Sequence, residues 1–124
     1  MPALGPLLCL ALNIYGEARG EDPDGQLAIA QVTMNRVEHT AYPKDVCSVV
    51  FQKDQFSWTK HPIIIREPAA FFYAIRVAED VLYDRPQDLT DGSTHFYSGK
   101  LAPYWADSMT VIGRIGNHTF LRTD

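Results

Sequence analysis

The segment Asn13-Ile14-Tyr15-Gly16-Glu17-Ala18-Arg19-Gly20-Glu21 joins an apolar run to a polar turn. A helix is predicted over 6–19, because Pro6 suits a first helical turn and apolar residues cover most of the helix circumference. Gly20 is the expected C-terminal stop. Glu17 therefore lies in or near the last turn, where the negative end of the helix dipole disfavours ionisation of a nearby acid. Proton donation near neutral pH needs such an environment or burial, so Glu17 is interpreted as a general acid.

Two further long helices are predicted from their start and stop signals. Asp22 and Pro23 are typical of an N-cap and a first helical position, and the helix that they begin is expected to reach residue 37 and to form an αα-hairpin with the first. Another helix is predicted over 68–83, with Glu67 as a weak cap. The segments between these helices are expected to be a short helix or single turn over 46–51 and a surface loop or short hairpin over 52–60.

The last third of the chain favours strands. Residues 93–98 alternate and are rich in β-formers, and residues 110–115 and 118–121 flank Gly116-Asn117, a predicted hairpin turn. Helices followed by short antiparallel strands indicate an α+β fold, with a helical N-terminal part packed on a small antiparallel sheet. The length of 124 residues predicts one domain, 1–124.

Composition and charge exclude several classes. The balance of apolar and charged residues is that of a globular protein, and a net charge of −4 argues against a nucleic-acid partner. The apolar run over 4–12 resembles the core of a signal peptide, but it lacks a basic n-region and a small-residue cleavage site. It is also too short to span a bilayer, so we interpret it as a core helix and expect a monomer with no membrane span and no clear export signal.

Cys9 and Cys47 lie in apolar surroundings, which favours two buried small hydrophobic residues. A disulfide between them is left open, because sequence alone cannot place them within bonding distance. No cofactor or metal is expected, since no residues have local ligand spacing, although a zinc site assembled from distant histidines stays open. The four histidines are His39, His61, His95 and His118.

Two segments have the residue types that hold sugars. Residues 55–58 combine aromatic faces with amide and hydroxyl groups, which can stack on a sugar ring and bond its rim; the alternative for Phe56 and Trp58 is a role as core anchors. Residues 92–97 are predicted to be extended, with one face lining a groove and with His95 as a structural histidine. The candidate substrate-binding residues are Gln55, Phe56, Ser57, Trp58, Thr94 and Tyr97.

Several ordered pieces of the chain match a known family. They are Ile14-Tyr15-Gly16-Glu17-Ala18-Arg19-Gly20-Glu21, Gly25-Gln26-Leu27-Ala28-Ile29-Ala30, Asn35-Arg36-Val37, Val46-Cys47-Ser48-Val49-Val50-Phe51, Gln55-Phe56-Ser57, Gly92-Ser93-Thr94-His95-Phe96-Tyr97 and Ile115-Gly116-Asn117-His118-Thr119-Phe120. With this set the chain resembles the SleB/CwlJ-type cell-wall hydrolases, the catalytic domain of spore cortex-lytic enzymes and of related bacterial and phage proteins. The resemblance implies a lysozyme-like or lytic-transglycosylase-like groove that cuts peptidoglycan glycan strands.

The family's catalytic glutamate falls on Glu17. The resemblance implies that this acid protonates the glycosidic oxygen between N-acetylmuramic acid and N-acetylglucosamine, then takes the proton of the muramic C6 hydroxyl as an anhydro ring closes. Ordinary glycosidases need two carboxylates, so a second acid such as Asp54 or Glu21 would reopen simple hydrolysis. From its position alone, Glu21 is expected to cap or to pair with Arg19 or Arg36.

Two other functions stay open at this point: a zinc-dependent N-acetylmuramoyl-alanine amidase, and a non-catalytic peptidoglycan-binding module. The expected partner in each case is peptidoglycan in the bacterial cell wall, in the periplasm or outside the cell. Without a clear signal peptide, we expect a phage-encoded or separately released protein. A phage lysis protein or a general wall-remodelling enzyme fits the chain better than a cortex-specific one.

Overall fold

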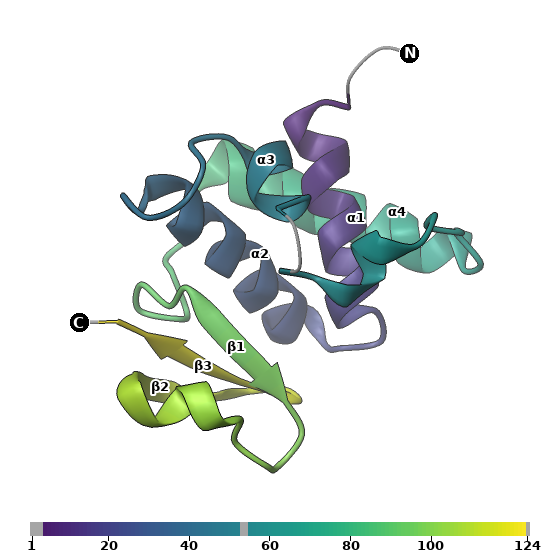
Figure 1. The fold of residues 1–124 in the computed structure, drawn as a ribbon. Coiled ribbons are helices and arrows are strands. Elements are labelled where there is room, and N and C mark those ends of the chain that lie inside the picture. Colours follow the sequence, from purple (N-terminus) through teal and green to yellow (C-terminus); the bar gives the residue numbers. More distant parts are fainter. Residues whose placement is uncertain (1–3, 53–54, 124) are drawn as a thin grey trace.

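The computed structural model describes residues 4–52 and 55–123, and it places a helical part beside a small sheet (Figure 1). The helical part consists of α1 (Pro6–Ala18), α2 (Pro23–Glu38), α3 (Val46–Val50) and α4 (Pro68–Glu79). The sheet consists of β1 (His95–Ser98), β2 (Thr110–Ile115) and β3 (His118–Arg122). The predicted α+β class, with helices and strands segregated along the chain, is confirmed.

The first two helices begin and end as their sequence signals predict. Pro6 opens α1, and Gly20 follows its end with a φ of 88°, in the left-handed region that favours glycine. The side chain of Asp22 caps α2 by accepting a hydrogen bond from the backbone N–H of Gly25 at 3.1 Å. Helix α1 lies in the middle of the helical part and packs against α2, α3 and α4, so Leu10 on α1 is completely buried.

The later helical segments differ from the predictions in detail. Helix α4 ends at Glu79, and the chain continues to Asp84 as a π-helical turn (η2, Asp80–Asp84). Glu67 provides no side-chain cap to α4; its carboxylate instead pairs with Arg19 at 2.9 Å. Residues 57–60 form a 3-10 helix (η1, Ser57–Lys60) rather than a hairpin, and a second one (η3, Tyr104–Ser108) was not predicted.

The three strands are antiparallel in the order β1-β3-β2. The predicted hairpin turn at Gly116-Asn117 joins β2 to β3, and Gly116 has a φ of 59°. A Cβ at Gly116 would lie 2.7 Å from the Oε1 atom of Glu21, so both the backbone conformation and the neighbouring loop require glycine here. Phe120 on the central strand is completely buried and belongs to the common core.

Amide side chains on α2 attach the segment that leads into β1. Gln31 donates to the carbonyl of Gln87 at 2.9 Å and accepts from the N–H of Leu89 at 2.9 Å. One turn later, Asn35 donates to the Asp88 carboxylate at 2.9 Å. The other groups that bond Asn35 or Asp88 are Thr90, Gly92 and Ser93. These bonds fix the sheet on the side of α2, where Figure 1 shows β1.

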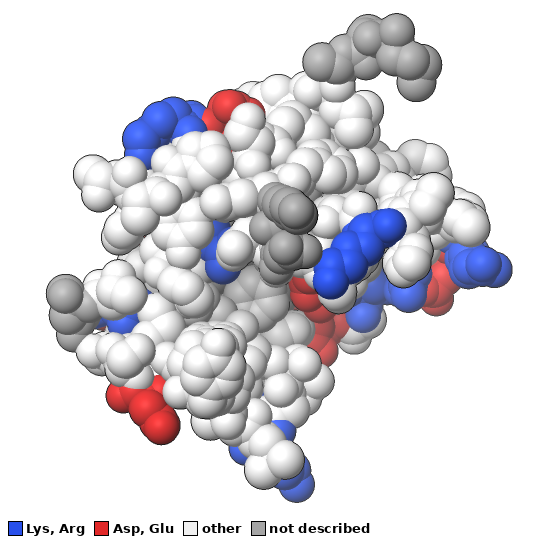
Figure 2. Space-filling view, in the orientation of Figure 1, with Lys and Arg blue, Asp and Glu red and all other residues white. Residues whose placement is uncertain are grey.

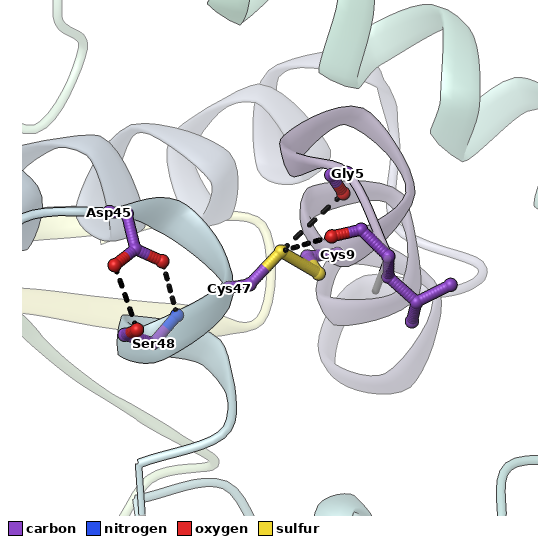
Figure 3. The surroundings of a disulfide bond; sticks show 6 residues. Gly5, Cys9, Asp45, Cys47 and Ser48 are labelled. Carbon is purple, nitrogen blue, oxygen red and sulfur yellow. Dashed lines mark hydrogen bonds between the residues drawn. A yellow bond between two sulfur atoms is a disulfide. The ribbon is translucent and has the colours of Figure 1, made fainter. Parts of the chain in front are cut away.

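Cys9 and Cys47 form a disulfide that ties α1 to α3, with their Cα atoms 5.3 Å apart (Figure 3). The favoured interpretation of two unpaired hydrophobic cysteines was therefore wrong. Their separation of 38 residues is the reason, because only the packing of α3 on α1 brings them together. Beside the bond, Asp45 caps α3 by accepting from the N–H of Ser48 at 2.9 Å. Among the described residues, no helix has the length and apolar character needed to cross a membrane.

Candidate active site

A cavity of about 800 Å³ opens between the helical part and the sheet. The space-filling view shows a hollow on this face between the two parts (Figure 2). Glu17, in the last turn of α1, lines this cavity and is half-buried. Aromatic rings supply much of the remaining wall; they belong to Phe56, Phe96, Tyr97 and Trp105. The cavity therefore combines the carboxyl group of Glu17 with the ring surfaces that stack on sugars.

The surroundings of Glu17 favour its protonated form. Burial raises the pKa of the Glu17 carboxyl, and the positive charge of Arg36 opposes this rise. Its place in the last turn of α1 adds the negative end of the helix dipole. The predicted acid thus has the environment that proton donation near neutral pH requires.

Trp58 fixes the loop beside Glu17 without lining the cavity itself. Its ring lies against Gly16, where a Cβ would come within 2.6 Å of the indole. Its Nε1–H donates to Asn13 Oδ1 at 3.2 Å, and the buried amide of Asn13 donates to Thr33 Oγ1 at 3.1 Å. Because Asn13 lies one turn before Glu17, this chain of bonds holds the 55–58 loop against the end of α1.

Arg36 links three segments around the cavity. Only 4% of its surface is exposed, and its Nε–H donates to the carbonyl of Thr94 at 2.7 Å. Its Nη1 donates to Gln55 Oε1 at 3.3 Å. The guanidinium also lies over the rings of Tyr42 and Phe56, at 5.0 and 5.3 Å from their centres. Arg36 therefore positions the segment before β1 and the Gln55 loop while it places a positive charge near Glu17.

The structure brings together four of the six predicted substrate-binding residues. Gln55, Phe56, Ser57 and Tyr97 line the cavity with Glu17. Thr94 and Trp58 are not among the lining residues. Thr94 is buried behind the wall, where its carbonyl accepts from Arg36.

Several of the described lining residues were not predicted as site residues, among them Arg36, His95 and Trp105. The ring of Trp105 on η3 lies 5.5 Å from His95 and 6.3 Å from Tyr97, measured between ring centres. Burial lowers the pKa of His95, and the charges of Arg36 and His39 lower it further, which favours the neutral imidazole. The adjacent aromatic residues Tyr104-Trp105 were the signal in the sequence that could have indicated this wall.

Glu21 lies outside the cavity lining and holds the hairpin turn. Its Oε1 accepts from the backbone N–H of Asn117 at 2.7 Å and lies 3.3 Å from Nδ1 of His118. The expected pairing of Glu21 with Arg19 or Arg36 was wrong, because the β2–β3 turn packs on Glu21 from a distant part of the chain. Asp54, the other candidate for a second acid, lies outside the described residues.

Within 4–52 and 55–123, no three His, Cys, Asp or Glu side chains lie close enough together to hold a metal ion. This part of the chain therefore offers no group of zinc ligands that would support the amidase hypothesis.

Comparison with known proteins places this chain in a family. Residues 20–121 match the sequence profile of the cell wall hydrolase family. The spore cortex-lytic enzyme of Halalkalibacterium halodurans is 35% identical over 112 residues, which are 90% of this chain and 33% of that protein. The spore cortex-lytic enzyme of Bacillus subtilis is 31% identical over 114 residues, 90% of this chain and 35% of that protein. The chain thus spans about a third of the length of these relatives.

Solved structures share the fold. The catalytic domain of the germination-specific lytic transglycosylase SleB from Bacillus anthracis matches with a TM-score of 0.78 and 24% identity, over 98% of this chain and 97% of that one. The catalytic domain of Bacillus cereus SleB matches with a TM-score of 0.72 and 24% identity, over 94% and 89% of the two chains. The architecture and the profile match agree, and the chain belongs to the cell wall hydrolase family.

Proposed function

We propose that the protein cuts peptidoglycan glycan strands between N-acetylmuramic acid and N-acetylglucosamine as a lytic transglycosylase. The observation that carries the proposal is the position of Glu17: it is the one carboxyl group among the described residues that line the cavity, and burial raises its pKa. Membership of the cell wall hydrolase family supports the substrate, and the relative described as a lytic transglycosylase supports the reaction.

Glu17 acts first as an acid and then as a base. The protonated carboxyl gives its proton to the glycosidic oxygen while the bond from that oxygen to the muramic C1 breaks. The muramic C6 hydroxyl then bonds to C1, and the Glu17 carboxylate takes the hydroxyl proton, so that the acid is regenerated and no water is consumed. Between these steps Glu17 is negatively charged, and the nearby charge of Arg36 stabilises that form.

The walls of the cavity hold the sugars for this reaction. The groups proposed to contact them are Gln55, Phe56, Ser57 and Tyr97. Amide and hydroxyl groups bond the polar rim of a sugar, and the rings pack on its apolar face. Trp58 and Thr94 are proposed to position the wall rather than to contact sugars. Trp58 donates a hydrogen bond to Asn13, and the carbonyl of Thr94 accepts one from Arg36 behind the wall.

The protein is proposed to act on the cell wall, outside the reducing cytosol. The Cys9–Cys47 disulfide supports this location, because disulfides persist in oxidising compartments. We also propose that residues 1–124 act together as one catalytic domain, since helices α1 and α2, the 55–57 loop and β1 all contribute to the cavity.

Product analysis tests the proposal. Purified peptidoglycan is digested, and the fragments are identified by mass spectrometry. Anhydromuramic ends are expected; ordinary reducing ends would show hydrolysis, and new free amino groups would show amidase activity. The Glu17→Gln variant keeps the shape of the side chain and removes its proton, so a loss of at least a thousandfold in kcat is expected. Near-normal turnover by this variant would exclude Glu17 as the acid, and binding without any product would indicate a binding module.

A further inference from the structure

Arg36 carries a hydrogen-bond donor that the protein does not use. Its Nε bonds Thr94 and its Nη1 bonds Gln55, whereas Nη2 has no hydrogen-bond partner within the part of the chain that the structure describes. In that same part no carboxylate lies within ion-pair distance of the guanidinium. Arg36 nevertheless lines the cavity although 96% of its surface is buried.

Gln55 adds a second unused donor on the same wall. Its Oε1 accepts from Arg36, which assigns the amide so that Nε2 is the remaining polar atom. Nε2 also has no partner among the described residues, and Gln55 is an exposed residue of the cavity lining. The Arg36–Gln55 pair, as we call these two side chains, therefore presents N–H donors and a positive charge to the cavity.

The chemistry of this pair selects its ligand. Glu17 is the nearby acid, but it forms no ion pair with Arg36 and carries no charge while it is protonated. A buried guanidinium with an unbonded N–H is costly in that state, so a positive group of this kind in a cavity indicates an acceptor supplied from outside. Carboxylates match guanidinium donors best, because charge and hydrogen-bond geometry act together. In a glycan strand the group of this class is the lactyl carboxyl of N-acetylmuramic acid. It is a free carboxylate where the stem peptide is absent and a neutral amide where a peptide is attached.

We propose that the Arg36–Gln55 pair binds the lactyl carboxylate of a muramic residue next to Glu17, so that the protein prefers strands without stem peptides. The inference rests on the proposed function and adds a substrate preference to it. The neutral acetamido carbonyl, which both sugars of the strand carry, is the competing ligand that the test must separate.

Chemically altered strands test the preference on the unmodified protein. Peptide-free strands are compared with the same strands after carbodiimide-driven conversion of the lactyl carboxylate to its primary amide. The expected result is a kcat/KM about tenfold lower on the amidated strands, the scale of one charge-assisted hydrogen bond. Deacetylated strands with free lactyl carboxylates serve as the third substrate. Their kcat/KM should stay close to that of the acetylated peptide-free strands.

Variants at Gln55 show where the carboxylate binds, and its exposure makes substitutions tolerable for folding. Gln55→Glu places a carboxylate on Arg36 and should reduce the ratio of kcat/KM values on free and amidated strands to about one. Gln55→Met removes one donor but leaves the charge, so part of the ratio should remain. Gln87→Glu is the matched control, because it makes the same change on an exposed side chain outside the cavity lining, and it should leave the ratio unchanged.

The outcomes separate this inference from the proposed function. Equal kcat/KM on free and amidated strands, with anhydromuramic products from both, would overturn the carboxylate site and leave the transglycosylase intact. A fall in kcat/KM that occurs only on the deacetylated strands would assign the Arg36–Gln55 pair to the acetamido group and would also overturn the inference. No anhydromuramic product from any of the strands would overturn the proposed function itself.

Discussion

Trp58 lies so close to Gly16 that a methyl group on Gly16 would come 2.6 Å from Cδ1 of the indole. The contact joins the end of α1, one residue before Glu17, to the loop that contains Gln55. It also explains why a glycine precedes the candidate acid within a helix, where glycine is otherwise unfavourable.

Gly16→Ala is expected to lower activity more than stability. The added methyl group displaces Trp58, at a cost of about 1–3 kcal/mol for an overpacked contact. Higher helix propensity offsets about 1 kcal/mol of that cost. Chemical unfolding should therefore show a modest change, while kcat/KM on peptidoglycan should fall at least tenfold because the Gln55 loop moves. Gly5→Ala is the control, since a Cβ at Gly5 would meet nothing within 4 Å; equal kinetic effects of the two variants would contradict this account.

The pH dependence of activity should show a raised pKa for Glu17. Because burial raises this pKa, Glu17 stays protonated beyond the usual range of a glutamate, and kcat/KM should decline as pH rises through the raised value. A pH profile of initial rates on soluble glycan strands measures this alkaline limb. A limb in the ordinary glutamate range would show that the carboxyl is not shielded.

Stability should respond to the same group. A folded-state pKa above the unfolded-state value means that the unfolded chain releases its proton first as pH rises. The free energy of unfolding therefore falls between the two pKa values and stays lower above them. Glu17→Gln lacks this titration, so the variant should gain stability relative to the parent protein across that window. Parallel pH curves from chemical denaturation would refute the shift.

Glu21 should anchor the β-hairpin through Asn117. Glu21→Ala removes the acceptor of a 2.7 Å bond and should lower the free energy of unfolding by about 1–3 kcal/mol. Glu21→Gln keeps an acceptor and should lose less. Glu79→Gln, at an exposed position of α4, is the control and should change stability by less than about 0.5 kcal/mol. Hydrogen exchange at the Asn117 amide measures the local effect, which should be absent in the control.

His118 should make stability sensitive to mild acid. Burial lowers the pKa of its imidazole, although the charge of Glu21 opposes this shift. The unfolded chain therefore binds a proton first as pH falls below the usual histidine range, and stability falls with it. Loss of the Glu21 charge should lower the His118 pKa further, so Glu21→Gln should extend the loss of stability to lower pH. NMR titration of the ring protons would test both directions.

The disulfide should contribute to stability rather than to catalysis. Reduction of Cys9–Cys47, which are 38 residues apart in sequence, is expected to lower the free energy of unfolding by about 2–4 kcal/mol. The double variant with alanine at both positions should be destabilised to a similar degree and should not respond to reductant. A parent protein whose unfolding curve is the same with and without reductant would show that the bond does not constrain the chain.

Local signals predicted most of the elements correctly. Pro6 and Gly20 bound the first helix, Asp22 caps the second, and Gly116 turns the hairpin, because each acts through the backbone conformation of its own neighbourhood. The position of Glu17 in a helical last turn followed from the same signals. The burial of Glu17 by the rest of the chain did not follow from these signals, because it depends on how distant segments pack around the end of α1.

The sequence by itself determined where the helices and the hairpin begin and end, and it presented Glu17 as the candidate acid, because backbone preferences act over a few residues. Only the tertiary structure decided which distant residues pair: Arg36 with Thr94, Glu21 with Asn117, and Cys9 with Cys47. These pairs are 38 to 96 residues apart in the chain. No periodicity or spacing records such pairs, because they form only when packed helices and a docked sheet bring distant side chains to one place.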